Sequence, residues 1–566
     1  MRLMMITASL CVCVAGVLSQ SSAEADDNTQ TRPQKVFQVP EESPAKWFAQ
    51  GASTAIKHGS AKAKAKNIIL FVGDGMSLPT VAASRIYEAQ LKGRSGEENQ
   101  LSFETMPYTG LSKTYNTDSQ TPDSAGTMSA MITGVKTRMG MLSVDQTSFR
   151  GNCKQSKTAT LMTAVELAEM AGLSTGVVTT TGITHATPGA TYAHVPDRNW
   201  ENDTELSVED KAAGCRDIAQ QFVDFNLGDG IEVALGGGRQ HFLAAGADDP
   251  EYQEYFGARL DGRNLIAEWQ KKSAGSDFVW NKAQLEALDL KKTKHLLGLF
   301  EPGHMNFESE RSKDRAGEPS LAEMTRTAIT VLKNNPNGFF LMVEGGRIDH
   351  AHHSGNAFRA VSETVAFSNA VRMAMEMTSD KDTLIIVTAD HSHTMTFAGY
   401  PTRGNPILGK VVGASGEGPS NGFALDAAGM PYTTLGYANG PGYVGATDQQ
   451  PEGIKKYPHQ VSGVQTASGR PDLRDINTED HDFMQEAAIP LGSETHGGDD
   501  VGIWARGPGA NAVRGTVEQN VIFHYLTQAN PRLRKVICSL SACKNSVPTT
   551  QPMITVRSQD RLKVRQ

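Results

Sequence analysis

The chain has 566 residues, of which 39% are hydrophobic and 20% are charged, so its composition is that of a globular protein with a large core rather than of a disordered one. The formal net charge of −8 disfavours a nucleic-acid-binding protein, because the binding surface of such proteins is normally basic, and we expect no nucleic-acid-binding surface. A negative net charge does not exclude an anionic substrate, since bound metal ions can reverse the local field.

Residues 1–23 have the pattern of a cleaved secretion signal. Arg2 precedes an apolar run over residues 3–18, and small residues follow up to Ala23. The run is short for a membrane span and ends near an Ala-x-Ala-like cleavage site; a retained anchor is the alternative. We expect a periplasmic or secreted protein with no membrane anchor after cleavage, and a disordered leader over residues 24–36.

Removal of the signal takes away two of the six cysteines and leaves four. An even number in an exported chain predicts two disulfides, with free buried thiols as the alternative. Cys538 and Cys543 are close enough in sequence to close a small loop. Cys153 and Cys215 then form the other pair.

From residue 37 onward, short apolar runs alternate with helical patterns. A helix is predicted over residues 44–56 and a buried strand over residues 67–73. Further strands are predicted at 176–179, 231–235, 339–343, 384–387 and 501–504, and further helices at 161–171, 321–332 and 361–377. Continuous apolar strands between helices predict an α/β fold, a doubly wound, mostly parallel sheet with helices on both faces. We expect residues 37–530 to form one catalytic domain.

Residues 399–490 break this alternation. The stretch is rich in Gly, Pro, Gln and Tyr and has little periodicity, which predicts an insertion with its own small structure, crown-like, as a lid or a dimer surface. Residues 531–566 are expected to be a C-terminal tail that contains the small disulfide loop. The polar end of this tail lacks the apolar run of a lipid-anchor signal.

Acidic and histidine side chains follow three of the predicted strands at the point where each strand ends. Asp74 follows the first strand, Glu344 follows another, and Asp390 with His391 follows a third. Each one alone could be a helix cap or a turn residue. Because the carboxyl ends of strands in an open α/β sheet form the ligand-binding edge, the three together predict a metal site.

A second group of possible metal ligands lies just beyond Glu344. On a helix, Asp349 and His353 lie four residues apart on one face, and His352 is a competitor that spacing cannot exclude. His496 precedes the last strand and could reach the same site from a loop. Asp and His ligands without a thiolate indicate zinc or a similar catalytic metal rather than a structural zinc finger.

Ser124 is the candidate nucleophile. Its small neighbours in Asp-Ser-Ala-Gly predict a helix N-terminus, where free N–H groups and the helix dipole favour an anion. The alternative is that Ser124 only caps the helix. A metal can activate the hydroxyl group without a Ser-His-Asp triad. Arg198 could clamp two phosphate oxygens, although by itself it is an ordinary loop arginine.

These motifs resemble those of the alkaline phosphatases from about Phe37 to Asn530. Thr-Pro-Asp-Ser-Ala-Gly is similar to the nucleophile signature of that family, and Val-Glu-Gly-Gly-Arg-Ile-Asp-His-Ala-His-His and Thr-Ala-Asp-His-Ser-His are equally characteristic. The similarity is closer to the animal enzymes and their bacterial look-alikes than to the short enteric type. It implies a homodimeric phosphomonoesterase that forms a phosphoserine on Ser124, with Arg198 binding the phosphate.

The resemblance also implies two zinc ions and one magnesium ion, each with its own ligands. The ligands of the first zinc are Asp349, His353 and His496; those of the second are Asp74, Asp390 and His391; those of magnesium are Asp74, Thr187 and Glu344. His393 is expected beside the zinc pair, His185 beside the magnesium, and Asp123 beside the nucleophile. His185 stands where the enteric enzymes carry Asp, as in the animal type.

A calcium site is the last feature that the resemblance implies. Glu251, Phe300 through its main-chain carbonyl, and Glu301 match three calcium ligands of the animal enzymes, and Glu318 stands where Asp is usual. The alternative is that these glutamates are solvated surface residues.

Two other functions compete with a phosphomonoesterase. A sulfatase, phosphodiesterase or phosphonate hydrolase would share the strand-end Asp and His ligands, but usually differs at the nucleophile and lacks the third metal. A non-catalytic metal-binding or phosphate-binding relative should have lost ligands, and none is missing here.

Overall fold

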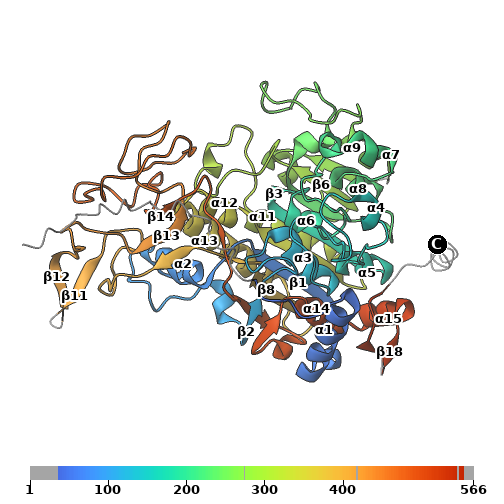
Figure 1. Ribbon diagram of the computed structural model, residues 1–566. Helices are drawn as coiled ribbons and strands as arrows, with labels where there is room; N and C mark the ends of the chain where they lie inside the picture. Colours follow the sequence, from blue (N-terminus) through green and yellow to red (C-terminus); the bar gives the residue numbers. More distant parts are fainter. Residues whose placement is uncertain (1–35, 273–274, 416–417, 545–546, 553–566) are drawn as a thin grey trace, which may run out of the picture. The chain divides into compact units, whose positions relative to one another are not determined.

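The computed structural model describes residues 36–272, 275–415, 418–544 and 547–552 (Figure 1). The predicted signal, almost all of the predicted leader and the end of the tail lie outside these residues. The chain divides into two units, residues 1–42 and residues 43–566. Within the first unit, residues 36–42 have no regular secondary structure. All helices and strands given below belong to the second unit.

A ten-stranded sheet is the centre of the second unit. In sheet order its strands are β17 (Thr516–Glu518), β2 (Tyr108–Lys113), β16 (Val501–Arg506), β8 (Thr383–Ala389), β1 (Asn67–Gly73), β7 (Phe339–Gly345), β3 (Ser174–Gly182), β4 (Val233–Gly237), β6 (His295–Leu299) and β5 (Ser276–Val279). From β8 to β5 every neighbouring pair is parallel, whereas β16 runs antiparallel to both β8 and β2. The predicted doubly wound, mostly parallel sheet is confirmed.

Helices cover both faces of this sheet, and β1 shows why its sequence is continuously apolar. Ile68 and Leu70 point into the core on one face, and Ile69 and Phe71 point into the core on the other. The first core contains residues of α1 (Pro44–His58), α3 (Ser124–Thr133), α5 (Ala164–Met170), α8 (Ile218–Asp224), α9 (Leu265–Lys272), α14 (Val521–Ala529) and α15 (Pro531–Leu540). The second contains residues of α2 (Leu78–Gln90), α10 (Lys282–Glu286), α11 (Leu321–Leu332) and α13 (Ala357–Met377).

The predicted strands and helices are present, with ends that local capping decides. The helix predicted from residue 161 begins only at Ala164, because the Thr163 side chain accepts a hydrogen bond from the Glu166 N–H while Glu166 accepts one from Thr163. Four strands of the sheet were not predicted: β2, β5, β6 and β17. Strands β5 and β17 are very short, and β2 is largely exposed, so hydrophobic periodicity gives these three little signal. Strand β6 is a buried apolar run that the sequence analysis missed.

The region predicted as an insertion supplies a hairpin and two of the three strands of a further small sheet. A three-stranded sheet joins β10 (Met395–Phe397), β13 (Leu435–Gly440) and β14 (Ala487–Pro490), and a hairpin joins β11 (Val412–Ser415) to β12 (Gly418–Phe423). Beyond the main sheet, β18 (Cys543–Lys544) pairs with β19 (Val547–Pro548). Among the described helices, none combines the length and apolar character that a bilayer span requires.

Both predicted disulfides are confirmed. Cys153 bonds to Cys215, and Cys538 bonds to Cys543. The second bridge ties the end of α15 to β18.

A pair of buried carboxyl groups lies at the amino end of the sheet, away from the predicted metal ligands. Glu169 accepts a hydrogen bond from the Thr175 hydroxyl group, and Glu232 accepts one from the Thr175 N–H, each over 2.6 Å. The second oxygen of Glu169 is buried and has no hydrogen-bond partner among the described residues. Burial and the neighbouring Glu232 raise the pKa of Glu169 to about 10, and burial raises the pKa of Glu232 to about 7.

We therefore expect Glu169→Gln to stabilise the protein at alkaline pH. In the unfolded chain a glutamate loses its proton near pH 4.5, whereas the folded protein keeps the proton on Glu169, so the free energy of unfolding falls as the pH rises from about 4.5 toward about 10. A glutamine at position 169 has nearly the same shape as the protonated glutamate but does not titrate, so the variant does not lose this free energy of unfolding. The free energy of unfolding should be measured by denaturant titration at pH 6 and at pH 9. The difference between the variant and wild type should increase by on the order of 2 kcal/mol, in favour of the variant, from pH 6 to pH 9.

Glu209→Gln is the matched control, because Glu209 is exposed and its substitution removes the same charge. Wild type and control should have the same pH profile. Parallel profiles for wild type and Glu169→Gln would show that the buried pair does not set the alkaline stability.

Candidate active site

The carboxyl edge of the sheet gathers the acidic residues that the sequence places at strand ends. Asp74 follows β1, Glu344 lies near the end of β7, and Asp390 follows β8, and these three strands are direct neighbours in the order β8-β1-β7. All three side chains are fully buried. Gly75 has a φ of 68°, and a Cβ atom there would lie 2.3 Å from the His393 ring, so glycine is required beside Asp74.

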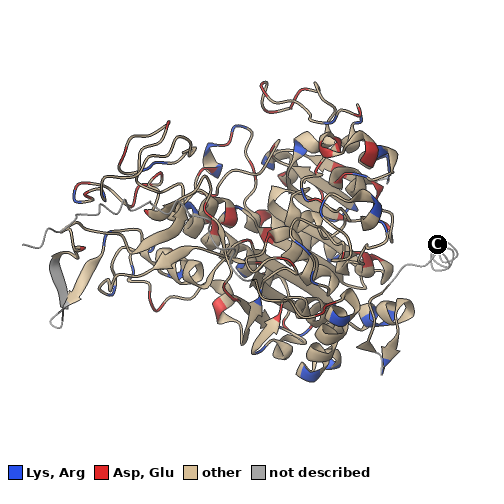
Figure 2. Ribbon diagram, viewed as in Figure 1, with Lys and Arg blue, Asp and Glu red and all other residues tan. Residues whose placement is uncertain are grey.

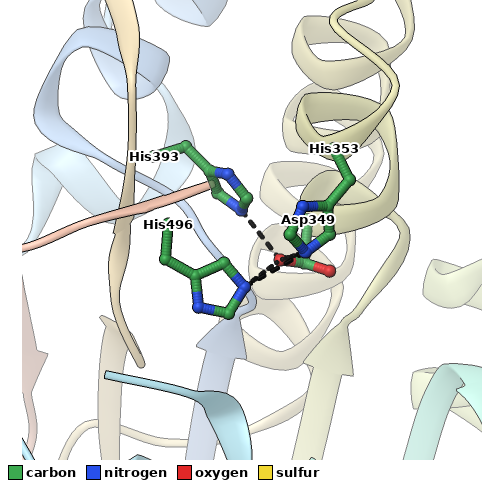
Figure 3. Close-up of side chains that lie close together, drawn as sticks. All are labelled: Asp349, His353, His393 and His496. Atoms are coloured by element: carbon green, nitrogen blue, oxygen red, sulfur yellow. Dashed lines mark hydrogen bonds and ion pairs between the residues drawn. The ribbon is translucent and has the colours of Figure 1, made fainter. Parts of the chain in front are cut away.

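The first cluster consists of Asp349, His353, His393 and His496, shown in Figure 3. Asp349 Oδ1 lies 3.3 Å from Nε2 of both His353 and His496, and the two Nε2 atoms lie 3.1 Å apart. Asp349 and His353 both come from α12 (Arg347–His353). His496 comes from β15 (His496–Gly497), which pairs with β9 (Ser392–His393) so that His496 lies opposite His393. Residues more than a hundred positions apart therefore converge on one point.

The structure also distinguishes between His353 and His352 as the possible metal ligand. His352 is completely buried, with Nε2 3.0 Å from the Thr80 hydroxyl oxygen and Nδ1 2.8 Å from the Tyr437 hydroxyl oxygen. Both of its ring nitrogens are occupied in the core. His353 instead turns its Nε2 toward Asp349 and His496, and its Nδ1 contacts the Glu494 carbonyl oxygen.

The second cluster consists of Asp74, Asp390 and His391. His391 Nε2 lies 3.3 Å from Asp74 Oδ1 and 3.3 Å from Asp390 Oδ2. The hydroxyl oxygen of Ser124 lies at the same point, 3.1 Å from His391 Nε2 and 3.3 Å from Asp74 Oδ1. Ser124 is therefore placed among side chains that could bind a metal.

Ser124 is the first residue of α3, and Asp123 is its N-cap. Asp123 Oδ1 accepts a hydrogen bond from the Gly126 N–H over 3.1 Å. The interpretation of Ser124 as the cap is therefore wrong, because the preceding residue performs that function. Its hydroxyl group is free to point into the second cluster, and it is only 2% exposed. The N-terminus of α3 adds a positive dipole end at this position.

Arg198 is held between Asp123 and His185. Its Nη1 donates to Asp123 Oδ2 over 3.1 Å, and its Nη2 lies 3.1 Å from His185 Nε2. Asp123 Oδ2 also accepts a hydrogen bond from the Gly140 N–H. Because Asp123 precedes Ser124 in the chain, this arrangement fixes the guanidinium group beside the serine.

A third group of possible ligands comprises Asp74 after β1, Glu344 in β7 and Thr187 in α6 (Ala186–Gly189), and ligand atoms of Asp74 and Glu344 come together with a ring nitrogen of His185. Asp74 Oδ2, Thr187 Oγ1 and Glu344 Oε1 are all buried, and none has a hydrogen-bond partner among the described residues. The other oxygen of Glu344 is bonded by Thr179 and Thr181, which leaves Oε1 free. Three orphaned oxygen atoms on the predicted magnesium ligands fit a hard cation, because buried polar atoms without partners are rare in native proteins.

The charges of the site also favour cations. Burial raises the pKa of Asp74 well above its usual range, and the carboxylates of Asp390 and Asp349 raise it further. Burial lowers the pKa of His391 well below its usual value, and His496 lowers it further, so the ring is neutral and able to bind a metal. A cation would relieve the repulsion among the carboxylates and use the neutral imidazoles.

The spacing of the ligand atoms fits zinc. Bonds of about 2.0 Å at tetrahedral angles place two ligand atoms about 3.3 Å apart. The separations among the Asp349, His353 and His496 atoms are 3.1 to 3.3 Å, and those from His391 to Asp74 and Asp390 are 3.3 Å. The donor sets are mixed carboxylate and imidazole, as in catalytic zinc sites.

Glu494 is a functional candidate that the sequence did not reveal. Its Oε2 lies 2.5 Å from His393 Nδ1, and its Oε1 accepts from the N–H and the hydroxyl group of Thr394. Burial would lower the pKa of His393, but Glu494 and Asp349 raise it to about 10. His393 Nε2 is 2.8 Å from Asp349 Oδ1, so Glu494 and His393 together orient a predicted zinc ligand. The only sequence signal was its position two residues before His496.

Two of the predicted calcium ligands come together in a separate cluster, with an unpredicted residue in place of Glu318. Ligand oxygens of Glu251 and Glu301 come together with one from Asp314, a residue that sequence reasoning missed. Glu318 is buried close by, but both its carboxylate oxygens accept from the Asn306 N–H, over 3.0 and 3.3 Å. Phe300 is buried beside Glu301.

The charges of this cluster also point to a cation. Burial and the neighbouring Glu251 raise the pKa of Glu301 to about 9, and burial raises the pKa of Glu318 to about 8. One oxygen of Asp314 is buried and has no hydrogen-bond partner among the described residues. Oxygen donors of this number and kind fit calcium.

Known proteins share both the sequence and the fold. A family model described as alkaline phosphatase matches residues 65–531. The alkaline phosphatase of Gadus morhua is 42% identical over 473 residues, which are 83% of this chain and 92% of that protein. The solved alkaline phosphatase of Thermus thermophilus has a TM-score of 0.58 and 23% identity, and the match covers 94% of this chain and all of that one (100%).

A third match is a solved variant of the alkaline phosphatase from the Antarctic bacterium TAB5. One histidine of that variant is replaced by aspartate, and magnesium is bound in its M3 site. It has a TM-score of 0.53 and 20% identity, and the match covers 82% of this chain and 98% of that one. At this level of identity the two structural matches show a shared fold.

Proposed function

The chain belongs to the alkaline phosphatase family and is an enzyme that hydrolyses phosphate monoesters, and we propose that it does so through a phosphoserine on Ser124. The observation that carries this proposal is the position of the Ser124 hydroxyl oxygen, 3.1 Å from His391 Nε2 and 3.3 Å from Asp74 Oδ1 at the N-terminus of α3. A nucleophile at this point meets the substrate phosphate beside the dipole end of the helix.

The metal complement that we propose is two zinc ions and one magnesium ion. Asp349, His353 and His496 would hold one zinc, and Asp74, Asp390 and His391 would hold the other. Asp74, Thr187 and Glu344 would hold the magnesium, a choice supported by their three orphaned oxygen atoms and by the magnesium in the M3 site of the TAB5 variant. When bound, such ions lower the pKa of a hydroxyl group and neutralise phosphate charge.

The side chains of this enzyme then bind and orient the phosphoryl group. Arg198 presents a planar pair of N–H donors that suits two phosphate oxygens, and Asp123 and His185 fix its orientation before substrate arrives. The Ser124 oxygen attacks phosphorus, the bond to the alcohol breaks, and the alcohol leaves with a proton. Water then hydrolyses the phosphoserine to release inorganic phosphate and restore Ser124.

One set of steady-state assays tests this function against its two rivals. The purified enzyme should hydrolyse p-nitrophenyl phosphate far faster than bis-p-nitrophenyl phosphate or p-nitrophenyl sulfate. A preference for the diester or the sulfate would assign the site to another reaction of metal-dependent hydrolases. No turnover of any of the three by the metal-loaded protein would favour a binding protein.

We also propose export from the cytoplasm and assembly as a homodimer. Export is supported by the two disulfides, because such bonds persist in oxidising compartments. Dimerisation is supported by the insertion and the residues directly next to it, where large apolar side chains lie exposed: Phe397, Tyr400, Leu425, Ile489 and Leu491. Exposed apolar side chains concentrated in one region are typical of an interface between subunits.

For the separate carboxylate cluster we propose a structural calcium ion. Adding calcium to metal-depleted protein should raise the melting temperature, because a ligand that binds only the folded state stabilises it. Glu251→Ala should abolish this increase and leave turnover with zinc and magnesium little changed, since the cluster lies apart from the active site. Equal calcium stabilisation in wild type and Glu251→Ala would contradict the proposal.

Two further variants decide which residue completes the calcium site. Asp314→Asn should weaken the calcium response if Asp314 is a ligand, as the geometry favours. Glu318→Gln should weaken it if the match to the animal enzymes holds. Both substitutions conserve size, so their comparison is matched.

A further inference from the structure

Three segments of the chain contain lysine and arginine but no aspartate or glutamate. They are residues 43–73, 506–517 and 519–552, in a protein with a net charge of −8. Their basic residues are Lys46, Lys57, Lys62, Lys64, Lys66, Arg506, Arg514, Arg532, Arg534, Lys535 and Lys544. The one carboxylate between the last two segments, Glu518, is paired with Lys113 and Lys136. The overall negative charge therefore conceals a local excess of positive charge.

These segments are neighbours in the fold. Helix α1 contacts the short helices η1 (Ser60–Lys62) and η6 (Ala510–Ala512) and strand β19, and α15 contacts α14 and β19. Arg534 donates to the Ala63 carbonyl oxygen, and Arg514 donates to the His58 carbonyl oxygen. Figure 2 shows Lys and Arg gathered over α1 and α15. We call the surface formed by these segments the basic face.

Most of the cations on the basic face are available to a partner. Lys57, Lys62, Lys64 and Lys66 are exposed, and within the described residues none of the four forms an ion pair. Lys535 is likewise exposed, and so is Arg514, whose guanidinium group also donates to the carbonyl oxygens of Lys57, His58 and Asn511. Asp382, whose main-chain carbonyl oxygen accepts from the Lys66 N–H, and Asp380 flank Lys381.

The basic face contains a hollow of about 370 Å³ at the C-terminal end of α1. Lys57, Lys62 and Arg514 line this hollow together with His58. Three cationic side chains around one concave site suit an anionic group such as a phosphate. Ile56, which precedes Lys57 in α1, has an apolar side chain that is 41% exposed.

The basic face lies at the edge of the sheet opposite to the active site. Lys66 immediately precedes β1, whose other end leads to Asp74. Arg506 ends the antiparallel strand β16, where it pairs with Ile385 near the start of β8. Anything bound at the amino edge would leave the carboxyl edge, and hence the active site, open to solution.

We propose that the basic face docks this enzyme onto an anionic lipid surface, with a headgroup phosphate in the hollow lined by Lys57, Lys62 and Arg514. The cations come from three segments spread over several elements rather than along one groove, which suits a plane of charge better than a single polymer strand. Ile56 adds an apolar contact of the kind that membrane interfaces accept. Docking of this kind would hold the enzyme at the surface with its active site turned toward soluble substrates.

The test is co-flotation of the metal-loaded enzyme with lipid vesicles. Wild type should float with vesicles of equal parts phosphatidylglycerol and phosphatidylcholine, should stay behind with pure phosphatidylcholine, and should be released by high salt. The triple variant Lys57→Gln/Lys62→Gln/Lys64→Gln should bind the anionic vesicles on the order of ten-fold more weakly or worse. Vesicle-bound wild type should hydrolyse p-nitrophenyl phosphate as fast as free enzyme.

A second triple variant, Lys154→Gln/Lys271→Gln/Lys291→Gln, removes the same charge from exposed lysines outside the basic face. It should bind anionic vesicles as wild type does, and both variants should keep full activity in solution, which also shows that they fold. Failure of wild type to bind, equal losses in the two variants, or no loss in the first would overturn the proposal. Binding to dextran sulfate but not to vesicles would assign the basic face to a soluble polyanion instead.

Discussion

Replacing Ser124 with alanine is expected to lower the turnover of phosphate monoesters by on the order of a thousand-fold or more, while the metal content stays at the wild-type level. The substitution removes the one hydroxyl oxygen that lies between His391 Nε2 and Asp74 Oδ1. Both residues have contacts that do not involve Ser124: His391 Nδ1 lies 3.2 Å from the Ser392 carbonyl oxygen, and the Asp74 N–H donates to the Gly345 carbonyl oxygen. We therefore expect the variant to lose the nucleophile while the surrounding side chains keep their positions.

The measurement combines steady-state kinetics with elemental analysis of the purified variant. Ser129→Ala is the control on the same helix, because its hydroxyl group donates only to backbone carbonyl oxygens and lies outside the metal-binding clusters. That variant should keep its turnover number even if it unfolds at a lower temperature. Acid quenching of wild type during turnover, followed by mass spectrometry of its peptides, should locate phosphate on Ser124. Phosphate trapped on another residue would refute the assignment.

Chelation is expected to abolish activity, and elemental analysis of the active enzyme should give two zinc ions and one magnesium ion per chain. The carboxylates and neutral imidazoles of the site are buried at mutual distances that suit bound metals. Without the metals, the carboxylates would repel the substrate phosphate, which Arg198 alone would have to attract. Restoring zinc and magnesium should restore turnover. One metal per fully active chain would be incompatible with this complement.

Single substitutions should remove the metals selectively. His496→Ala should lower the zinc content by one ion, and Glu344→Gln should lower the magnesium content with a smaller effect on zinc. The matched control is His481→Ala in the cluster Asp480, His481 and Asp482, whose ligand atoms also lie close together and whose histidine is exposed. Exposed acidic groups are well solvated without a metal, so this control should leave both metal contents and turnover unchanged.

Much of the site followed from the sequence because strand ends are a local property. Asp74 and Asp390 each follow a continuous apolar run, and parallel strands bring their carboxyl ends to one edge whatever their order in the sheet. Ser124 was identified by its small neighbours and the helix start that they imply. The disulfide of Cys538 with Cys543 followed from proximity in the chain, and the remaining pair followed by elimination.

Other parts of the site depend on contacts between distant segments, which no local pattern encodes. His352 and His353 are equally plausible from spacing, and only the packing of His352 against Thr80 and Tyr437 leaves His353 to face the site. His496 reaches Asp349 through the pairing of β15 with β9. The support that Glu494 gives to His393 depends on the same long-range pairing.

The sequence by itself thus determined the fold class and the disulfides and pointed to the candidate strand-end ligands and the candidate nucleophile, because each depends on periodicity, spacing or residue type within a short stretch. Only the tertiary structure decided that Asp123 and not Ser124 caps α3, and that Asp314 comes together with Glu251 and Glu301 while Glu318 turns to Asn306. It also gathered the lysines of α1 and the arginines near the C-terminus into one basic face on a chain of negative net charge. The physical reason is the same in each case. The contacts of a side chain depend on which partners the folded chain brings within hydrogen-bonding or Coulombic distance, and those partners are not its neighbours in sequence.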